Sequence, residues 1–303
     1  MTHSRRDIVE LLESHGLSPR RAFGQNFVAD PNTVRRIARL ADVGPSDHVV
    51  EIGAGLGSLT LALAETGARV TAIEVDHGIV PVLRDVVRDF DNVHVIESDA
   101  RDVDWDALEP STSGLTAPNI TPITVVANLP YNVATPLVAD LLDTVPRIHR
   151  FVVMVQKEVA QRLAAAPGSS DYGAISVKVA YWATARVLGD VPPTVFVPRP
   201  KVTSAIIEIV RHEQPAVTSD PDVLFPLIRR AFSQRRKMLR RSLHGVVTDE
   251  QFTAAHIEST RRPEELSVHD WGRLADTVKI SETEKISETE KTSETEKKEI
   301  RES

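Results

Sequence analysis

The chain has 303 residues, 41% of them hydrophobic and 26% charged, so it is long enough for two folded domains. It has no cysteine, which excludes disulfides and thiolate metal sites, and no apolar stretch reaches the roughly 18 residues of a membrane-spanning helix. The N-terminus has no apolar signal segment and the ten histidines are scattered, so we expect a cytoplasmic protein with no metal and no membrane partner. The net charge is −7.

The chain begins with a stretch, residues 1–20, that is expected to be helical and then loop-like. Asp30-Pro31 follows, a pair in which an N-cap residue precedes proline at the first position of a helix. From residue 48 to about 165 strands and helices alternate. This alternation is typical of a parallel sheet with helices on both faces.

A glycine-rich loop follows the first strand of this region, His48–Ile52. The loop reads Glu51-Ile-Gly53-Ala-Gly55-Leu-Gly57-Ser58, and a helical pattern follows it. Glycine lets the backbone pass close to a ligand between a strand and a helix. The spacing differs from the Gly-x-Gly-x-x-Gly of dinucleotide-binding proteins. Alone, the loop is also compatible with a simple tight turn.

Acidic residues follow the next two strands. The strand Arg69–Glu74 ends in a carboxylate about 20 residues past the loop, where it can accept hydrogen bonds from both hydroxyls of a ribose. The strand 92–96 is followed by Asp99, which can accept from an adenine amine. A single acid of this kind is often only a solvated strand end. Three consecutive strand tips with such residues predict a nucleoside cofactor at the carboxyl edge of the sheet.

The apolar strand 123–127 ends in Asn128-Leu129-Pro130-Tyr131. The Asn oxygen and a neighbouring main-chain carbonyl can accept the two hydrogen bonds of an exocyclic amine, and the ring can stack on the base that carries it. Proline keeps the turn rigid. Together with the glycine-rich loop, this tetrapeptide predicts an adenine amino-methyltransferase.

The remaining chain divides at about residue 212. Before it, an exposed loop is expected at 111–122, and a strand at 151–156 leads into a helix. An antiparallel pair formed by 186–191 and 204–210 would close the sheet at its edge, where the prolines between them are tolerated. After it, only helices are predicted, over 221–232, 234–243, 249–259 and 264–278.

Two segments of this C-terminal part have unusual composition. Residues 229–241 contain seven basic residues in thirteen and no acid that could pair with them. A solvated helix face is the ordinary explanation, but the missing acids favour contact with phosphate. Residues 279–303 repeat a hexapeptide with at most one large apolar residue in each copy. Such a segment cannot bury enough surface to fold alone and is predicted to be a disordered tail.

The chain closely resembles the small-subunit ribosomal RNA adenine dimethyltransferases, the kasugamycin-resistance family, over roughly residues 18–245. Besides the motifs above, the resemblance rests on Gly24-Gln-Asn-Phe27, Val155-Gln-Lys-Glu-Val159 with Pro167-Gly-Ser169, Phe196-x-Pro-x-Pro-Lys-Val-x-Ser204 and Ala231-Phe-Ser-Gln-Arg-Arg-Lys-Met-Leu-Arg240. It implies an α/β fold: a Rossmann-like class I methyltransferase sheet in residues 1–211, whose segment 18–30 lines the cofactor site. A small all-helical, basic, rRNA-binding domain would occupy 212–278, followed by the tail.

The resemblance also implies S-adenosylmethionine as the methyl donor, in a pocket formed by Asn26, Val28, Gly53, Glu74, Asp99 and Asn128. Val28 stands where the family often has leucine, a conservative change. Catalysis would fall to Asn128, Leu129, Pro130 and Tyr131. Tyr131 and Phe196 would stack on the extruded base, although a Phe beside prolines is as often simple packing. Arg235, Arg236 and Lys237 would contact the RNA.

The implied reaction is dimethylation of the N6 amine of two adjacent adenines in the 3′-terminal hairpin loop of 16S (small-subunit) rRNA, by a monomer and linked to subunit maturation. Three alternatives stay open: an Erm-type large-subunit rRNA adenine dimethyltransferase, a non-catalytic RNA-binding factor and a DNA adenine methyltransferase. The sequence does not specify the assembly stage of the substrate, the order of the two methylations, the role of the tail, or whether release is a maturation checkpoint.

Overall fold

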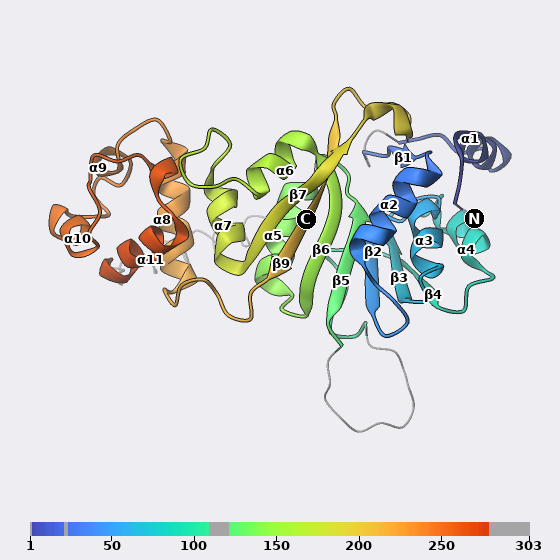
Figure 1. Ribbon diagram of the computed structural model, residues 1–303, viewed down its shortest axis with the longest axis horizontal. Helices are drawn as coiled ribbons and strands as arrows, with labels where there is room; N and C mark the ends of the chain where they lie inside the picture. Colours follow the sequence, from blue (N-terminus) through green and yellow to red (C-terminus); the bar gives the residue numbers. More distant parts are fainter. Residues whose placement is uncertain (1, 21–23, 109–120, 279–303) are drawn as a thin grey trace, which may run out of the picture. The chain divides into compact units, whose positions relative to one another are not determined.

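The computed structural model describes residues 2–20, 24–108 and 121–278 (Figure 1). The chain forms two compact units. The first contains the chain up to Ala165 together with Lys178–Pro215, and the second contains Ala166–Val177 together with the chain from Ala216 onward. The predicted boundary at 212 had left 166–177 in the first domain. The tail 279–303 and most of the predicted loop 111–122 lie outside the described residues.

The first unit is built on a seven-stranded sheet with the order β4-β3-β2-β5-β6-β9-β7. Its strands are β2 (His48–Ile52), β3 (Arg69–Glu74), β4 (Val93–Glu97), β5 (Ile123–Asn128), β6 (Ile148–Gln156), β7 (Ala183–Val191) and β9 (Ser204–Arg211). Strands β2 to β6 are parallel, and β9 pairs antiparallel with both β6 and β7. The predicted parallel sheet with an antiparallel pair at its edge is therefore confirmed.

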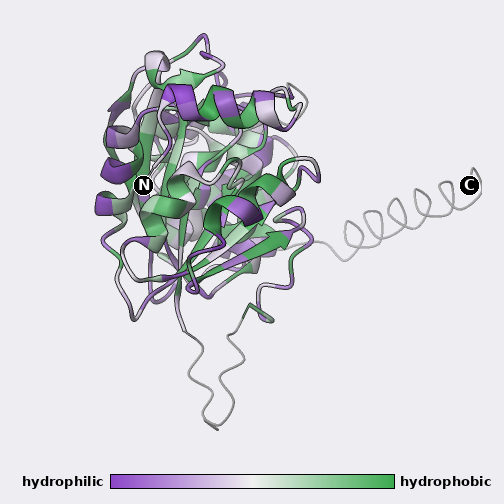
Figure 2. Ribbon diagram, turned by 90° about the vertical axis from the view of Figure 1, so that its right-hand side faces the viewer, coloured by the Kyte–Doolittle hydropathy of each residue, from purple (hydrophilic) through white to green (hydrophobic). Residues whose placement is uncertain are grey.

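The central strands are continuous apolar runs because side chains on both faces of the sheet are buried. Val49 and Val50, which point to opposite faces of β2, are both fully buried. One face packs against α2 (Pro31–Ala41) and α3 (Ser58–Ala64), and this core includes Ile37, Leu63 and Met154. Figure 2 shows hydrophobic residues concentrated on the strands.

The remaining helices of the first unit are α1 (Arg5–Ser14), α4 (Val80–Val87), α5 (Ala134–Thr144), α6 (Lys157–Leu163) and, partly, α7 (Ala174–Trp182). The side chain of Asp30 accepts hydrogen bonds from the N–H groups of Asn32 and Thr33, so the predicted N-cap of α2 is confirmed. Just before it, β1 (Phe27–Val28) pairs antiparallel with β8 (Phe196–Val197), which follows the short helix η2 (Pro193–Val195). This two-stranded ribbon fixes the N-terminal segment beside the carboxyl ends of the central strands.

The second unit contains α8 (Pro221–Ser233), α9 (Leu239–Ser242), α10 (Asp249–Ala254), η3 (Pro263–Glu265) and α11 (Val268–Thr277). Trp271 is fully buried at its centre, and its ring lies 6.1 Å from that of Phe232, which in turn contacts Tyr172 at 6.2 Å. The partner Tyr172 explains why segment 166–177 belongs to this unit. None of the described helices is long and apolar enough to cross a membrane.

The predicted helix 234–243 is wrong over its first half. Residues 234–237 form a turn, and helix resumes only at Leu239. The reason is a competing contact, because the N–H groups of Leu239 and Arg240 donate to the carbonyls of Arg261 and Ser259. The predicted helix 249–259 likewise ends at Ala254, two residues before His256 takes a positive φ of 56°.

Candidate active site

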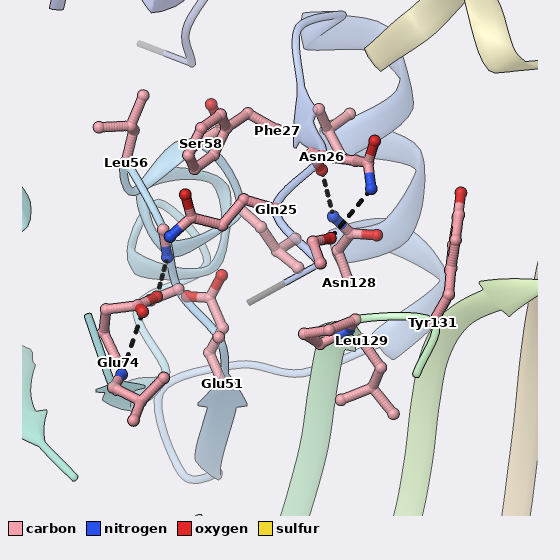
Figure 3. A pocket seen from close by; sticks show the side chains of 18 residues that line it. Gln25, Asn26, Phe27, Glu51, Leu56, Ser58, Glu74, Asn128, Leu129 and Tyr131 are labelled. Atoms are coloured by element: carbon pink, nitrogen blue, oxygen red, sulfur yellow. Dashed lines mark hydrogen bonds between the residues drawn. The ribbon is translucent and has the colours of Figure 1, made fainter. Parts of the chain in front are cut away.

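A pocket open to solvent lies at the carboxyl ends of β2, β3 and β5 (Figure 3). Its walls come from residues 24–28, from residues between 51 and 59, from Glu74 and Val75, and from 128–131. The chain runs outward in both directions from β2 and β5, so the pocket occupies the topological switch point of the sheet. This is the usual ligand site of open α/β folds.

The glycine-rich loop forms the floor of the pocket. Gly53 and Gly55 have positive φ values of 72° and 56°, a conformation that side chains with a Cβ rarely adopt. A Cβ on Gly55 would also lie 3.1 Å from Cε1 of Phe27, a pocket residue on β1. The loop therefore needs glycine both for its own conformation and to admit the N-terminal segment.

Glu74 at the end of β3 is buried and holds this loop in place. Its Oε2 accepts a hydrogen bond from the Gly55 N–H at 2.8 Å, and its Oε1 accepts from the N–H groups of Val75 and Asp76 at 3.0 and 2.9 Å. Burial raises the pKa of Glu74, and the three N–H groups oppose that shift. A carboxylate has about four acceptor positions, so one remains for a ligand hydroxyl in this conformation.

Glu51 is a second buried carboxyl group on the pocket, 2% exposed at the end of β2. Burial raises its pKa to about 8, and nearby Glu74 adds to the shift. Its Oε2 has no hydrogen-bond partner among the described residues. A carboxylate inside an otherwise apolar strand is the sequence signal that identifies this residue, because such a group is rarely buried without a partner.

Asn128 lies across the pocket from the two carboxyl groups (Figure 3). Its Nδ2 donates to the main-chain carbonyl of Asn26 at 2.9 Å, and the Asn26 side chain donates to the carbonyl of Gly24 at 2.9 Å. Gly24 packs closely on the turn that follows Asn128, because a Cβ on Gly24 would lie 3.2 Å from Cβ of Pro130. With its amide nitrogen occupied, Asn128 presents its side-chain oxygen as an acceptor.

The two main-chain carbonyls after Asn128 differ in their availability. The carbonyl of Pro130 already accepts hydrogen bonds from the N–H groups of Val133 and Ala134, at 3.2 and 3.1 Å. The Leu129 carbonyl accepts none from the described residues, while its N–H donates to Met154 and its side chain is buried. The structure thus separates two acceptors that the sequence could not distinguish.

The two predicted aromatic residues have different environments. The ring of Tyr131 lines the pocket, and its hydroxyl is 2.7 Å from Oγ of the buried Ser204 on β9. Phe196 is fully buried in the core beneath β1 and β8 and does not line the pocket. In this structure Phe196 is therefore not placed to stack on a base in the pocket, because the pairing of β8 with β1 leaves its ring in the core.

Two further predicted residues lie away from the pocket or are already paired. Asp99 is not a pocket residue, and its carboxylate pairs with Arg101, the closest contact being 2.6 Å. The side-chain hydrogen bonds from Arg101 hold the pKa of Asp99 below its usual range. In the second unit, Arg235 binds Glu264 and the carbonyl of Ser170, each at 2.5 Å. By contrast Arg236 and Lys237 are exposed.

Of the predicted cofactor residues, the structure thus places Asn26, Val28, Gly53, Glu74 and Asn128 on one pocket and leaves Asp99 outside it. Gln25 and Phe27 also line it. They lie in the segment 18–30, which was expected to line the site, but sequence reasoning did not single them out. Both belong to the motif Gly24–Phe27, and the presence of this motif in the N-terminal segment is the signal that could have found them.

Comparisons with known proteins agree with this geometry. A family model described as ribosomal RNA adenine dimethylase matches residues 16–279. The ribosomal RNA small subunit methyltransferase A of Magnetococcus marinus is 43% identical over 270 residues, covering 88% of this chain and 94% of the relative. The protein of the same name from Streptococcus pyogenes is 40% identical over 279 residues, covering 89% and 95%.

Two solved structures share the fold, each at 23% sequence identity. A dimethyladenosine transferase from Plasmodium falciparum has a TM-score of 0.67, covering 81% of this chain and 94% of that one. The 23S rRNA methyltransferase ErmE has a TM-score of 0.61, covering 83% and 99%. The Rossmann-like methyltransferase fold is thereby confirmed, and the chain belongs to the ribosomal RNA adenine dimethylase family.

Proposed function

We propose that this protein uses S-adenosylmethionine to dimethylate the N6 amine of two adjacent adenines in the 3′-terminal hairpin loop of small-subunit rRNA. The family and the relatives named for the small subunit, at 40 and 43% identity over most of both chains, support this substrate. The likeness to ErmE at 23% identity concerns the fold, so it does not favour the large-subunit alternative.

The observation that carries the proposal is the orientation of Asn128. An adenine amine is a poor nucleophile because its lone pair is delocalised into the ring. The Asn128 Oδ1, freed by the bond from Nδ2 to Asn26, and the Leu129 carbonyl would each accept one N–H of the amine. Two fixed acceptors localise the lone pair on the remaining face of the nitrogen, where it can attack.

The chain's own residues then need only position the amine. S-adenosylmethionine supplies an electrophilic methyl group when it is bound. Once methylated, the amine nitrogen would be acidic, so it would lose its extra proton to water without help from a strong base. Asn128 and Leu129 therefore position the amine and need not act as a base. In the second methylation the monomethylated amine has one N–H left, so it would bond to only one of the two acceptors.

The residues of the pocket fit this cofactor. Gly53 and Gly55 let the backbone approach a ligand, Glu74 keeps an acceptor position for a ribose hydroxyl, and Asn26 and Val28 form the opposite wall. The buried Glu51, whose Oε2 has no hydrogen-bond partner among the described residues, would ionise when a cationic group binds beside it, since a buried carboxylate is stable only when paired. Asp99 would reach an adenine amine only after leaving Arg101.

For the RNA, we propose that Tyr131 stacks on the extruded adenine, with Ser204 fixing the edge of its ring. In the second unit, Arg236 and Lys237 are exposed and suited to phosphate contact, whereas Arg235 acts within the fold. Both contacts suit the rRNA of the small subunit, which is the proposed partner.

The test is methyl transfer from labelled S-adenosylmethionine to undermethylated small subunits, large subunits and DNA in parallel, followed by nucleoside analysis. Dimethyladenosine on small subunits alone is the expected result. Label in large-subunit rRNA would instead favour the Erm-type large-subunit alternative. Cofactor binding without transfer to any substrate would point to a non-catalytic RNA-binding factor.

A further inference from the structure

Asp76, two residues after Glu74, is a buried acidic residue with no part in the chemistry described above. It is 2% exposed. Its Oδ2 accepts a hydrogen bond from Nε2 of Gln25 at 2.8 Å, and its Oδ1 accepts from Nη1 of Arg20 at 3.1 Å and from the N–H of Gly78 at 3.0 Å. Its carboxylate thus joins the tip of β3 to the N-terminal segment.

The contacts between Arg20 and Gln25 complete this junction. The N–H of Arg20 donates to Oε1 of Gln25 at 2.7 Å, and the N–H of Gln25 donates to the carbonyl of Arg20 at 3.4 Å. Both ends of the Gln25 amide are therefore fixed, its oxygen by Arg20 and its nitrogen by Asp76. This holds the backbone directly before Asn26, on the wall of the pocket.

Asp76 also contacts Glu74. The N–H of Asp76 donates to Oε1 of Glu74 at 2.9 Å. On the other side, Gln25 is adjacent to Asn26, whose carbonyl orients Asn128. A continuous path of hydrogen bonds and one peptide link therefore runs from the Glu74 carboxylate, through Asp76 and Gln25, to the Asn128 amide.

We propose that Asp76 is a positioning residue that couples the cofactor carboxylate Glu74 to the amine-binding amide of Asn128. The inference rests on the proposed function of the pocket and deepens it. A residue that only capped its own turn would need no more than the Gly78 contact. Asp76 instead also binds two residues that lie 51 and 56 positions earlier in the chain.

The substitution Asp76→Asn separates these two roles. Its remaining oxygen still accepts from Gly78, but its amide nitrogen now faces the Gln25 nitrogen, so two donors oppose each other. We expect the dissociation constant for S-adenosylmethionine to rise and kcat at saturating cofactor to fall, each by about tenfold. The reason is that Glu74 and Asn128, on the two sides of the pocket, would no longer be held in position relative to each other. Calorimetry and single-turnover methylation of small subunits measure the two effects separately.

The matched control is Asp47→Asn. The Asp47 carboxylate also binds a backbone N–H, that of Gly44 at 2.7 Å, but it precedes β2 and so lies at the opposite edge of the sheet from the pocket. Its substitution is expected to leave both constants unchanged. A second probe is Gln25→Ala, which removes the link while leaving the Asp76 turn intact, and it should reproduce the Asp76→Asn defect.

A reciprocal swap supplies a readout that a purely structural role would not move. Gln25→Glu alone places two carboxylates face to face and should be the most damaging variant. Combined with Asp76→Asn, it restores one donor and one acceptor with their positions exchanged, and we expect most of the lost cofactor affinity and kcat to return.

Two outcomes would overturn the inference. One is an Asp76→Asn protein that has a lower unfolding temperature but normal cofactor affinity and kcat, since Asp76 would then be a turn cap. The other is a swap variant no better than its parents. Wild-type protein that bound no cofactor would overturn the proposed function itself, and the inference with it.

Discussion

Asn128 is the residue on which the proposed chemistry depends most directly. In Asn128→Ala the amine of adenine loses one of two fixed acceptors, so we expect kcat to fall about 10²–10³-fold. Affinity for S-adenosylmethionine should change much less. Asn132→Ala is the matched control, because Asn132 belongs to the same turn but is exposed. Near-normal turnover by the Asn128→Ala enzyme would contradict the assignment.

Glu51 predicts how stability depends on pH. Its folded pKa of about 8 lies above the ordinary value of 4.5, so unfolding releases a proton between these pH values and stability falls as pH rises through that window. Glu51→Gln removes this loss. At pH 7 the variant should gain on the order of 3 kcal/mol over wild type, and at pH 4.5 almost nothing.

Denaturant unfolding of both proteins at several pH values measures this difference, in the absence of cofactor. Thr124→Val, at a buried position on the neighbouring strand β5, is a control that changes polarity without a titrating group. A Glu51→Gln advantage that did not grow between pH 4.5 and 8 would mean that the carboxyl group is not held neutral by burial.

For single residues, the sequence indicated which residue types belong to the site more reliably than where their side chains point. Glu74 and Asp99 both follow strands, yet only Glu74 faces the pocket, because Arg101 takes the carboxylate of Asp99. Phe196 and Arg235 were predicted to contact RNA, but strand pairing buries the first and Glu264 binds the second. These outcomes depend on partners distant in sequence, which a motif does not show.

The elements of the sheet were predictable because their signals are local. A buried strand such as β2 is a continuous apolar run, and its carboxyl end is marked by glycines. In the second unit local signals were not enough, since helices were predicted over 221–232 and 234–243 and so over nearly all of the basic run 229–241. Its interruption at 234–238 comes from contacts of Leu239 with Arg261, which propensity does not include.

One charged group links three elements of the first unit. Arg150 on β6 donates to the carbonyls of Leu40 and Ala41 at the end of α2, and pairs with Glu208 on β9. Burial tends to raise the pKa of Glu208, but Arg186 and Arg150 outweigh it and hold that pKa below its usual value. Arg150 therefore satisfies a buried charge and helix-end carbonyls together.

We expect Arg150→Met to lower the free energy of unfolding by roughly 3 kcal/mol, because the mutation leaves Glu208 and two carbonyls without their main donor. Arg186→Met is the matched control. Its side chain is 71% exposed, so its loss should cost less than about 1 kcal/mol. Equal effects in denaturant unfolding would show that the helix-end contacts contribute nothing.

At the scale of the whole molecule, charge is segregated: a chain of net charge −7 carries a strongly basic run. In the folded chain, some basic residues of this run bond to other parts of the protein and others are exposed. Arg230 and Arg235 are used internally, donating to His244 and to Glu264 and Ser170. Arg236, Lys237, Arg240 and Arg241 are exposed. Because an acidic body disfavours binding to arbitrary nucleic acid, we expect affinity for RNA to come from these exposed residues.

This division gives neighbouring arginines opposite predicted effects. Arg236→Gln should weaken small-subunit binding and reduce the slope of log K against log salt concentration by about one, with an unchanged unfolding temperature. Arg235→Gln should instead lower the unfolding temperature, because Glu264 and the Ser170 carbonyl lose their donor. Binding titrations at several salt concentrations, paired with thermal unfolding, separate the two. If Arg235→Gln reduced the salt slope while remaining as stable as wild type, Arg235 would be an RNA contact, and its internal bonds would have to break on the ribosome.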